Sequence, residues 1–571
     1  MKRSLNVKNG KVLVLGNDNR SFLSVCRSLG RKGICVHVGW CEKNLPAIKS
    51  RYINTRVNIP TYSKDKNNWK NILINILKKE KYDLVIPCDD QSIIPLQHYK
   101  KEFERICKIY LLDDKTYSLA NDKYQMQKLA KSLGINVPKE IELSKTANID
   151  FILSELSLPL VIKPKSSFTI NRLDKKNYVK KYFSKKELQI FLDNMNDSQM
   201  VIAQKNFIGK GVGVELLAHN GEILYVFEHI RIHEPLTGGG SSYRKSVPLH
   251  PELLEASKKL MKALNYTGVA MVEFKVNFKT SQWVFIELNA RFWGSLPLAI
   301  ASGADFPFFL YMMLVHQKTT FVQYYDTNIY CRNVAKDIKW IISNLRADRS
   351  NQALETLPLK EVFSEIKHIL RMQERLDTVT IDDIKPGIYS FINIMSKSYI
   401  KIKEKLLSKK ILRLTQINKA MDLLKSAESL LFICKGNICR SPFAHYYLES
   451  FLLDSVSVES CGYYPQDGRS CPSNGIEAAK KFGLDMTSHR SKQVSSDLIS
   501  EADIIFTFDE ANYQTVKNKF PLAKDKLYRI GLFSQSGLVI KDPYGENVKY
   551  FDEIYQLIAQ AIDSIVKYKK S

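Results

Sequence analysis

Apolar runs of strand length alternate with helical stretches through the first part of the chain. Residues 11–16 form such a run, and others follow at Ile34–Val38 and Leu84–Pro87. This alternation is typical of a small parallel sheet covered by helices, and we expect it over residues 1–112. Gly16 is the only loop glycine after the first run, so no dinucleotide-binding fingerprint is present. The strand-end loops remain candidates for facing a substrate.

From about residue 113 the pattern predicts a mixed α+β module whose elements carry charged residues. An amphipathic helix is predicted over Lys123–Leu133, and the strand Leu160–Pro164 carries Lys163 toward a loop. A further strand is predicted over Met200–Gln204. Glycines then gather at Gly209, Gly211 and Gly213, and again within residues 237–242.

Two later strands at hairpin distance each present a carboxylate, Glu273 on the first and Glu287 on the second. Asn289 lies two residues beyond Glu287, so both side chains face the same side of the strand. Two carboxylates and an amide oxygen suit Mg²⁺ that bridges phosphates, and Arg291 can stabilise a transferred phosphoryl group. Together with the lysines and the glycine-rich loop, this set points to ATP used to activate a carboxylate.

These motifs stand in an order that resembles the ATP-grasp superfamily, specifically the carbamoyl-phosphate-synthetase-like ligases, over about residues 10–320. The resemblance implies a Rossmann-like pre-ATP-grasp domain at 1–112 and an ATP-grasp domain at 113–320. It also implies an acyl phosphate, formed from a carboxylate with ATP and Mg²⁺, that an amine-type substrate attacks.

The resemblance also assigns binding residues. It implies that ATP binds at Lys123, Lys163, Gln204 and Arg291, and that Mg²⁺ binds at Glu273, Glu287 and Asn289. The chain departs from the family at the adenine hinge, where Gln204-Lys205-Asn206 replaces the usual Gln-Glu-Tyr. The ribose contact is left open, with Glu215 as a candidate.

Residues 321–427 predict a helical completion of the ligase module and a basic connector. Between Lys397 and Lys419, eight Lys or Arg accompany one Glu, with apolar residues at helical spacing. The apolar positions are Ile402, Leu406, Ile411, Leu414 and Ile417. Such a helix can lie on an acidic membrane or pack its apolar stripe on a neighbouring domain. We expect the packed helix, so membrane association is not predicted.

Residues 428–571 again alternate strands and helices, as a doubly wound parallel sheet requires. One apolar run ends at Cys434, and Arg440 follows five residues later, before a helix predicted over Pro442–Leu453. Loop amides and a helix N-terminus make an anion cradle. A cysteine in that field is expected to be a thiolate nucleophile, and Arg440 can grip a phosphate with two nitrogens.

The stretch Cys434-Lys-Gly-Asn-Ile-Cys-Arg-Ser-Pro closely resembles the low-molecular-weight protein tyrosine phosphatases, and the likeness extends over residues 428–571. It implies Cys434 as nucleophile, Arg440 as phosphate clamp and Asp542 as general acid and base, with Tyr544 as a wall for an aromatic substrate. The phosphate loop would be supported by Lys435, Gly436, Asn437, Ile438, Cys439 and Ser441, of which Asn437 and Ser441 hold its shape and tune the thiolate.

The cysteines leave two further hypotheses. The same fold hosts thioredoxin-coupled arsenate reductases, but their resolving cysteines lie much further from the nucleophile than Cys461 and Cys471, so this activity is not expected. Cys439 could instead form a reversible disulfide with Cys434 and protect it from over-oxidation.

The composition of the chain limits which other partners and which location can be expected. The chain has 571 residues and a net charge of +26, but its basic residues are spread out and no nucleic-acid-binding motif is present, so no nucleic acid partner is expected. The ten cysteines show no metal spacing, and neither a signal peptide nor an apolar run of membrane-spanning length is found. A cytoplasmic protein is predicted.

The sequence therefore predicts a multidomain α/β enzyme with two activities, an ATP-grasp ligase fused to a tyrosine phosphatase. In the alternative, the ATP-grasp part only senses nucleotide and does not ligate. The phosphatase substrate is either a phosphotyrosine protein or a phosphorylated metabolite.

Overall fold

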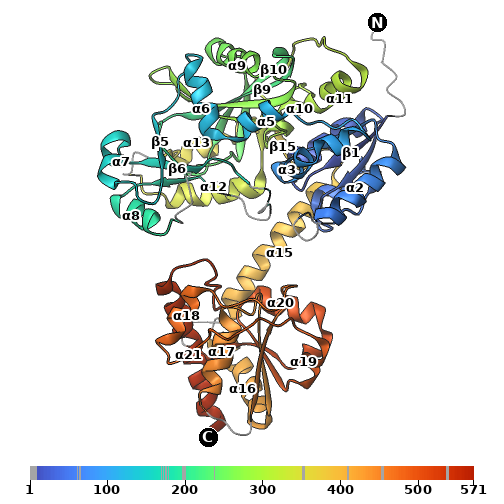
Figure 1. Cartoon of the computed structure of the whole chain (residues 1–571). Helices are drawn as coiled ribbons and strands as arrows, with labels where there is room; N and C mark the ends of the chain where they lie inside the picture. The colour runs from blue at the N-terminus through green and yellow to red at the C-terminus, as the bar shows by residue number, and fades with distance from the viewer. Residues whose placement is uncertain are drawn as a thin grey trace. The chain divides into compact units, whose positions relative to one another are not determined.

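The structure, a computed structural model, divides into two compact units, Met1–Ile394 and Met395–Ser571 (Figure 1). It describes residues 10–60, 62, 66–168, 170, 173, 177, 179–195, 201–236, 238–349, 354–407, 410–451, 456–534 and 539–570, with the backbone alone at 397–407, 410–415 and 570. Met200, Thr237 and the apolar positions Ile402, Leu406, Ile411 and Leu414 of the predicted basic helix lie outside the described residues or side chains. Ile417 packs against the core of the second unit.

The first unit begins with a parallel four-stranded sheet in the order β3-β2-β1-β4. Its strands are β1 (Lys11–Leu15), β2 (Cys35–Gly39), β3 (Thr55–Arg56) and β4 (Leu84–Pro87), and its main helices are α1 (Ser21–Arg31), α2 (Lys66–Glu80) and α3 (Asp90–His98). Val12 and Val14 belong to one hydrophobic cluster, whereas Leu13 and Leu15 belong to another. Because alternate residues of a strand face opposite sides, the sheet is covered on both faces, as the apolar run predicted.

A seven-stranded sheet forms the centre of the first unit, in the order β13-β12-β9-β10-β11-β14-β15. Its strands are β9 (Lys210–His219), β10 (Glu222–His233), β11 (Tyr243–Val247), β12 (Gly268–Asn277), β13 (Gln282–Asn289), β14 (Tyr330–Arg332) and β15 (Glu374–Leu376). All neighbours pair antiparallel except β14 and β15. Helix α9 (Pro251–Ala263) packs on β9 and β10, and α6 (Lys123–Ser132) packs on β13.

A separate antiparallel sheet has the order β5-β8-β6-β7. Its strands are β5 (Glu140–Leu143), β6 (Leu160–Pro164), β7 (Lys180–Tyr182) and β8 (Val201–Lys205), and α7 (Ile149–Leu156) and α8 (Lys185–Asp193) pack on it. The remaining helices of this region are α4 (Lys100–Glu104), α5 (Asp114–Asn121), α10 (Leu296–Ala301) and α11 (Phe306–His316).

The stretch predicted as a helical connector also supplies two strands, β14 and β15, to the seven-stranded sheet. Each has three residues, too few for a strand pattern to stand out in the sequence. Its helices are α12 (Val334–Arg346), α13 (Leu359–Ser364), α14 (Ile366–Leu370), α15 (Lys385–Leu407) and α16 (Lys410–Ser426). The sheet of the first unit thus continues well past residue 320.

The second unit holds a parallel four-stranded sheet in the order β17-β16-β18-β19. Its strands are β16 (Ser429–Cys434), β17 (Ser457–Gly462), β18 (Ile504–Thr507) and β19 (Leu527–Arg529). Its helices after the connector are α17 (Arg440–Glu449), α18 (Ser473–Lys480), α19 (Ser496–Glu501), α20 (Glu510–Lys519) and α21 (Val548–Lys570). Phe432 packs in one core with α17, α18 and α21, and Leu431 packs in another with α19 and α20. The predicted multidomain α/β class with a doubly wound sheet is confirmed.

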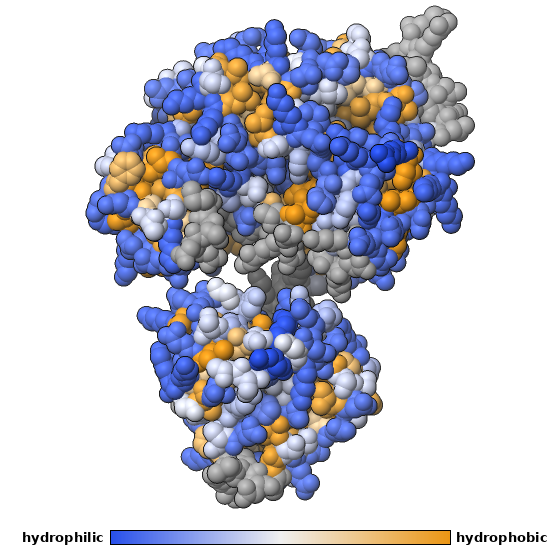
Figure 2. Space-filling view, in the orientation of Figure 1, coloured by the Kyte–Doolittle hydropathy of each residue, from blue (hydrophilic) through white to orange (hydrophobic). Residues whose placement is uncertain are grey.

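The visible surface of each unit is mostly hydrophilic, with scattered hydrophobic patches (Figure 2). In the part of the chain that the structure describes, none of the helices combines the length and the apolar character needed to span a bilayer.

Candidate active sites

The predicted phosphate loop lies at the carboxyl end of β16, between Cys434 and the first residue of α17, Arg440. Strand β16 pairs with β17 on one side and β18 on the other, so the loop occupies the point where the strand order reverses, a usual place for ligands in such sheets. The Asn437 backbone N–H donates to Cys434 Sγ over 3.2 Å, and Ser441 Oγ lies 3.1 Å from the same sulfur. The loop therefore turns its polar groups toward the sulfur.

Asn437 braces the loop from inside. Its φ of 50° is in the left-handed region, which Asn tolerates better than most residues, and its side chain is fully buried. The amide nitrogen Nδ2 donates to Ser441 Oγ and Ser460 Oγ, both at 3.0 Å, while Oδ1 accepts from the Lys492 amide at 2.9 Å. Asn437 thus contacts Ser441, the other residue predicted to hold the loop, and also Ser460, which the sequence did not single out.

Arg440 is 1% exposed and contacts two carboxylates. Its Nη1 lies 2.6 Å from Asp509 Oδ2, and its Nη2 lies 2.9 Å from Asp542 Oδ2, which brings the predicted general acid to the predicted clamp. Burial lowers the pKa of Arg440, but the negative charges of Cys434, Asp542 and Asp509 outweigh it and raise the pKa. Asp509 lies two residues beyond the end of β18 and caps α20, a position that the sequence pattern alone could have indicated.

The other cysteines of this unit are buried and unpaired. Burial, followed by the charge of Cys434, raises the pKa of the Cys439 thiol well above its usual value, and the same two causes raise that of Cys471 to about 12. Such thiols are poor nucleophiles, unlike a cysteine at an anion cradle. The Cys434–Cys439 disulfide stays a prediction.

In the first unit, one cavity of about 460 Å³ is lined by strands of both antiparallel sheets and by the glycine-rich loop. All seven residues predicted to bind ATP or Mg²⁺ line it, namely Lys123, Lys163, Gln204, Glu273, Glu287, Asn289 and Arg291. Residues that lie up to 168 positions apart in the sequence therefore meet in one space.

The two predicted metal-binding carboxylates lie directly opposite each other, since Glu273 on β12 pairs in register with Glu287 on β13. Like charges across a strand pair repel, and each carboxylate has a cation beside it. Arg231 Nη2 lies 2.6 Å from Glu273, and Lys123 Nζ lies 3.0 Å from Glu287. Burial raises the pKa of Glu273. For Glu287, the charge and hydrogen bond of Lys123 together with Asn289 and Arg291 outweigh burial and lower the pKa to about 2.

These side chains fit a magnesium ion by their chemistry. Asn289 Nδ2 donates to Glu287 Oε1 over 3.2 Å, so the amide lies beside the carboxylates. The described residues contain no cluster of three or more His, Cys, Asp or Glu able to hold a metal, and this set has only two carboxylates and one amide. Mg²⁺ commonly takes one or two carboxylates and completes its shell with phosphate oxygens and water, so the set suits Mg²⁺ bound together with a nucleotide.

Lys163 and Gln204 meet at a carboxylate that the sequence analysis missed. Glu140, on β5, lies 3.4 Å from Lys163 Nζ and accepts a 3.0 Å hydrogen bond from Gln204 Nε2. Burial lowers the pKa of Lys163 and raises the pKa of Glu140. The alternation Glu140-Ile141-Glu142 is typical of a strand, but nothing in it marks Glu140 as part of a site.

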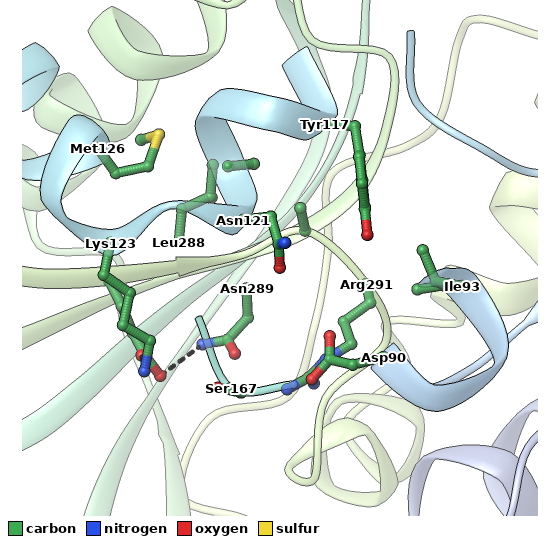
Figure 3. Close-up of a pocket in the computed structure, with 13 residues that line it drawn as sticks. Asp90, Ile93, Tyr117, Asn121, Lys123, Met126, Ser167, Leu288, Asn289 and Arg291 are labelled. Carbon is green, nitrogen blue, oxygen red and sulfur yellow. Dashed lines mark hydrogen bonds and ion pairs between the residues drawn. The ribbon is translucent and has the colours of Figure 1, made fainter. Parts of the chain in front are cut away.

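Arg291 Nε lies 2.8 Å from Asp90 Oδ1, and the two side chains point toward each other in Figure 3. Asp90 is the first residue of α3, just after the loop that follows β4. That loop is one of the strand-end loops that are candidates for facing a substrate. Glu215, the candidate for the ribose, is fully buried, accepts from Ser295 Oγ and pairs with His229, and it is not among the residues that line the cavity.

A cysteine and an arginine that flank a five-residue loop at the switch point of a doubly wound sheet define a phosphatase-like unit. Residues 429–570 match the family model described as low molecular weight phosphotyrosine protein phosphatase, and the chain belongs to this family. Residues 248–309 match the model for the carbamoyl-phosphate synthase L chain, ATP binding domain. Both predicted resemblances, and their fusion in one chain, are confirmed.

Relatives of the second unit include two bacterial phosphatases. The probable low molecular weight protein-tyrosine-phosphatase EpsP of Ralstonia nicotianae is 32% identical over 139 residues, 24% of this chain and 94% of that protein. The protein-arginine-phosphatase of Geobacillus stearothermophilus is 29% identical over 138 residues, 24% of this chain and 90% of that protein. Among solved structures, N5-carboxyaminoimidazole synthetase from Staphylococcus aureus complexed with ADP matches at 16% identity with a TM-score of 0.46, over 60% of this chain and 87% of that one.

Proposed function

We propose that the chain is an enzyme with two activities, an ATP- and Mg²⁺-dependent carboxylate ligase in the first unit and a phosphomonoesterase in the second. The observation that supports the ligase is the gathering of the seven predicted ATP and Mg²⁺ residues around one cavity. For the esterase, it is the loop that directs the Asn437 backbone amide and Ser441 to Cys434, next to Arg440.

In the first unit, Lys123 and Lys163 neutralise the phosphates of ATP, and Arg291 stabilises the γ-phosphoryl group as it moves to the carboxylate. The products are an acyl phosphate and ADP, and an amine-type nucleophile then displaces phosphate from the acyl carbon. When bound, Mg²⁺ would be held by Glu273, Glu287 and Asn289 and would neutralise phosphate charge. Lys123 already neutralises Glu287 in the free protein, so the same lysine is positioned to move its charge to a phosphate.

In the second unit, Cys434 Sγ attacks phosphorus, and the ester oxygen leaves with a proton from Asp542. Water then attacks the cysteinyl phosphate while Asp542 takes its proton, which releases inorganic phosphate and restores the thiolate. Arg440 binds the oxygens that carry charge in both steps. A phosphotyrosine protein is the proposed substrate, and a phosphorylated metabolite is the second candidate.

ADP release against a panel of carboxylates and amines tests the ligase, with Glu287→Gln as the inactive control. A module that only senses nucleotide would bind ATP without releasing ADP with any acid. For the second unit, Cys434→Ser is expected to abolish hydrolysis of p-nitrophenyl phosphate, and hydrolysis at the wild-type rate would refute the mechanism. Rates on phosphotyrosine peptides, phosphoarginine peptides and sugar phosphates separate the substrate classes.

A further inference from the structure

A cluster of three cations lines the cavity of the first unit and has no role in the proposed phosphoryl transfer. Arg20, Arg244 and Lys336 line the cavity together with Gly294. They come from the loop after β1, from β11 and from the first turn of α12. Three separate elements therefore place positive charge in the space that also holds the predicted ATP and Mg²⁺ residues.

Arg20 lies against the bare Cα of Gly294, where an added Cβ would be only 2.6 Å from Arg20 Cζ. Gly294 follows Arg291 by three residues, so the Arg20 guanidinium contacts the same segment that carries the proposed phosphoryl-stabilising arginine. Among the described residues, no side chain accepts a hydrogen bond from this guanidinium or forms an ion pair with it. Burial, followed by the charge of Arg244, lowers the pKa of Arg20. A charge desolvated without a partner is costly, which favours a ligand at this point.

Arg244 is fully buried and contacts the backbone of Gly294. Its Nη1 donates to the Gly294 carbonyl at 2.6 Å, and its Nη2 lies 2.5 Å from Asp377 Oδ1. Its Nε is buried without a hydrogen-bond partner in the described structure. Asp377 is shared, because Cys331 Sγ and Asn333 Nδ2 also contact it. Asp377, the one carboxylate that forms an ion pair with the cluster, therefore also binds Cys331 and Asn333.

Lys336 completes the cluster. Its side chain keeps contact with solvent, and no carboxylate in the described ranges forms an ion pair with it. Partial desolvation, followed by the charges of Arg20 and Arg244, lowers its pKa to about 8.

The negative groups that act on the cluster are Asp377, Asp18 and, on Arg244, Glu215. Asp18 accepts from the Arg20 backbone amide and from Ser21 Oγ, and Glu215 accepts from Ser295 Oγ and pairs with His229. Each of these carboxylates therefore has other partners, and in the described structure none of them forms an ion pair with Arg20 or Lys336.

We propose that Arg20, Arg244 and Lys336 bind a second anionic group of the acid that the first unit activates, so that the acid is a dianion rather than a simple monocarboxylate. The inference rests on the proposed ligase function and specifies its substrate class. The reacting carboxylate lies toward Arg291 and the magnesium residues, and the second anion lies at Gly294. A carboxylate and a phosphate share the chemistry that two guanidinium groups and an ammonium group recognise.

Thermal unfolding followed by tryptophan emission tests the proposal, because all five tryptophans (40, 69, 283, 293 and 340) lie in the first unit. The full chain with Cys434→Ser is heated with succinate, 3-phosphoglycerate or butyrate at constant ionic strength. A ligand that binds only the folded state raises the Tm, because it stabilises that state by RT ln(1 + [L]/Kd). We expect at least one dianion, but not butyrate, to raise the Tm, and the effective acid distinguishes a carboxylate from a phosphate as the second group.

In Arg20→Met and Lys336→Met, the apparent Kd of that dianion is expected to rise about tenfold or more, whereas Lys258→Met, on the exposed face of α9, leaves it unchanged. Without ligand, Arg20→Met should not lower the Tm, since it removes an unpaired charge. Equal shifts with butyrate, no shift with either dianion, or an unchanged Kd in Arg20→Met would overturn the proposal. ADP release with monocarboxylates would keep the ligase and remove this inference, whereas dianion binding without ADP release would do the reverse.

Discussion

Arg291 and Asp90 form an ion pair, with Nε 2.8 Å from Oδ1, that joins the segment just after β13 to the first turn of α3. The N-terminal sheet thereby contributes directly to the cavity of the ATP-grasp-like module. Burial lowers the pKa of Arg291, but the charge and hydrogen bond of Asp90, together with the charges of Glu287 and Asp89, outweigh burial and raise the pKa. Asp90 therefore positions the arginine that is proposed to act on the phosphoryl group.

Asp90→Asn keeps an acceptor at this position but removes its charge. We expect ADP release to fall at least about tenfold and the free energy of unfolding of the first unit to fall by about 1 kcal/mol. Steady-state kinetics and urea unfolding monitored by tryptophan emission measure the two effects. Asp193→Asn, on the surface of α8, serves as the control and should change neither.

Glu228 makes the stability of the first unit depend on pH. Burial raises the pKa of its carboxyl to about 7, while the backbone amide of His250 donates to it at 2.8 Å. The folded state therefore binds this proton more tightly than the unfolded state, whose carboxyl has a pKa of about 4.3. The resulting stability is fully present below about pH 4.3 and is lost as the pH rises to about 7, by about 4 kcal/mol at most.

Glu228→Gln keeps the acceptor and cannot ionise. Its unfolding free energy should show no loss from this group between pH 5 and pH 8, so at pH 8 the variant is expected to be more stable than the wild type. Urea unfolding at both pH values measures this difference. A wild-type and a variant curve that fall in parallel would contradict the assignment.

Asn437→Ala removes the brace of the phosphate loop. It leaves Ser441 Oγ and Ser460 Oγ without a donor and the Lys492 amide without its acceptor. We expect the second unit to lose about 2–3 kcal/mol of stability and kcat for p-nitrophenyl phosphate to fall more than tenfold, by about 1.4 kcal/mol or more in activation free energy. Asn518→Ala, exposed on α20, is the matched control; if both variants behaved alike, the bracing role would be wrong.

Asp542 and Asp509 both contact Arg440, but only Asp542 is proposed to transfer a proton. Asp542→Asn should slow hydrolysis of phenyl phosphate by about 10²–10⁴-fold and that of p-nitrophenyl phosphate less, because nitrophenolate leaves without a proton. Asp509→Asn should weaken both reactions by a similar factor. Equal sensitivity of the two variants to the leaving group would remove the assignment of Asp542 as the acid.

The sequence was most informative where a site is contiguous. Cys434 and Arg440 are close in the chain, so their spacing alone indicates a phosphate loop, and the strand pattern places it correctly. Lys163 and Glu287 lie far apart, and only the resemblance to a family connected them. The partners Arg231, Glu140 and Asp90 were missed because an ion pair between distant residues leaves no periodic trace. Arg20 was missed for a further reason, since its significance comes from the lack of a partner.

Strand β11 pairs with β14 on the side away from β10, and β14 pairs in turn with β15. A fragment that ended at residue 320 would therefore leave the outer backbone groups of Tyr243–Val247 open, and open strand edges pair readily with other chains. In the whole protein the outermost strand has only three residues, which is a poor template for such pairing. Residues beyond 320 thus act as protection against aggregation, and fragments of the first unit should extend past Leu376 to remain monomeric.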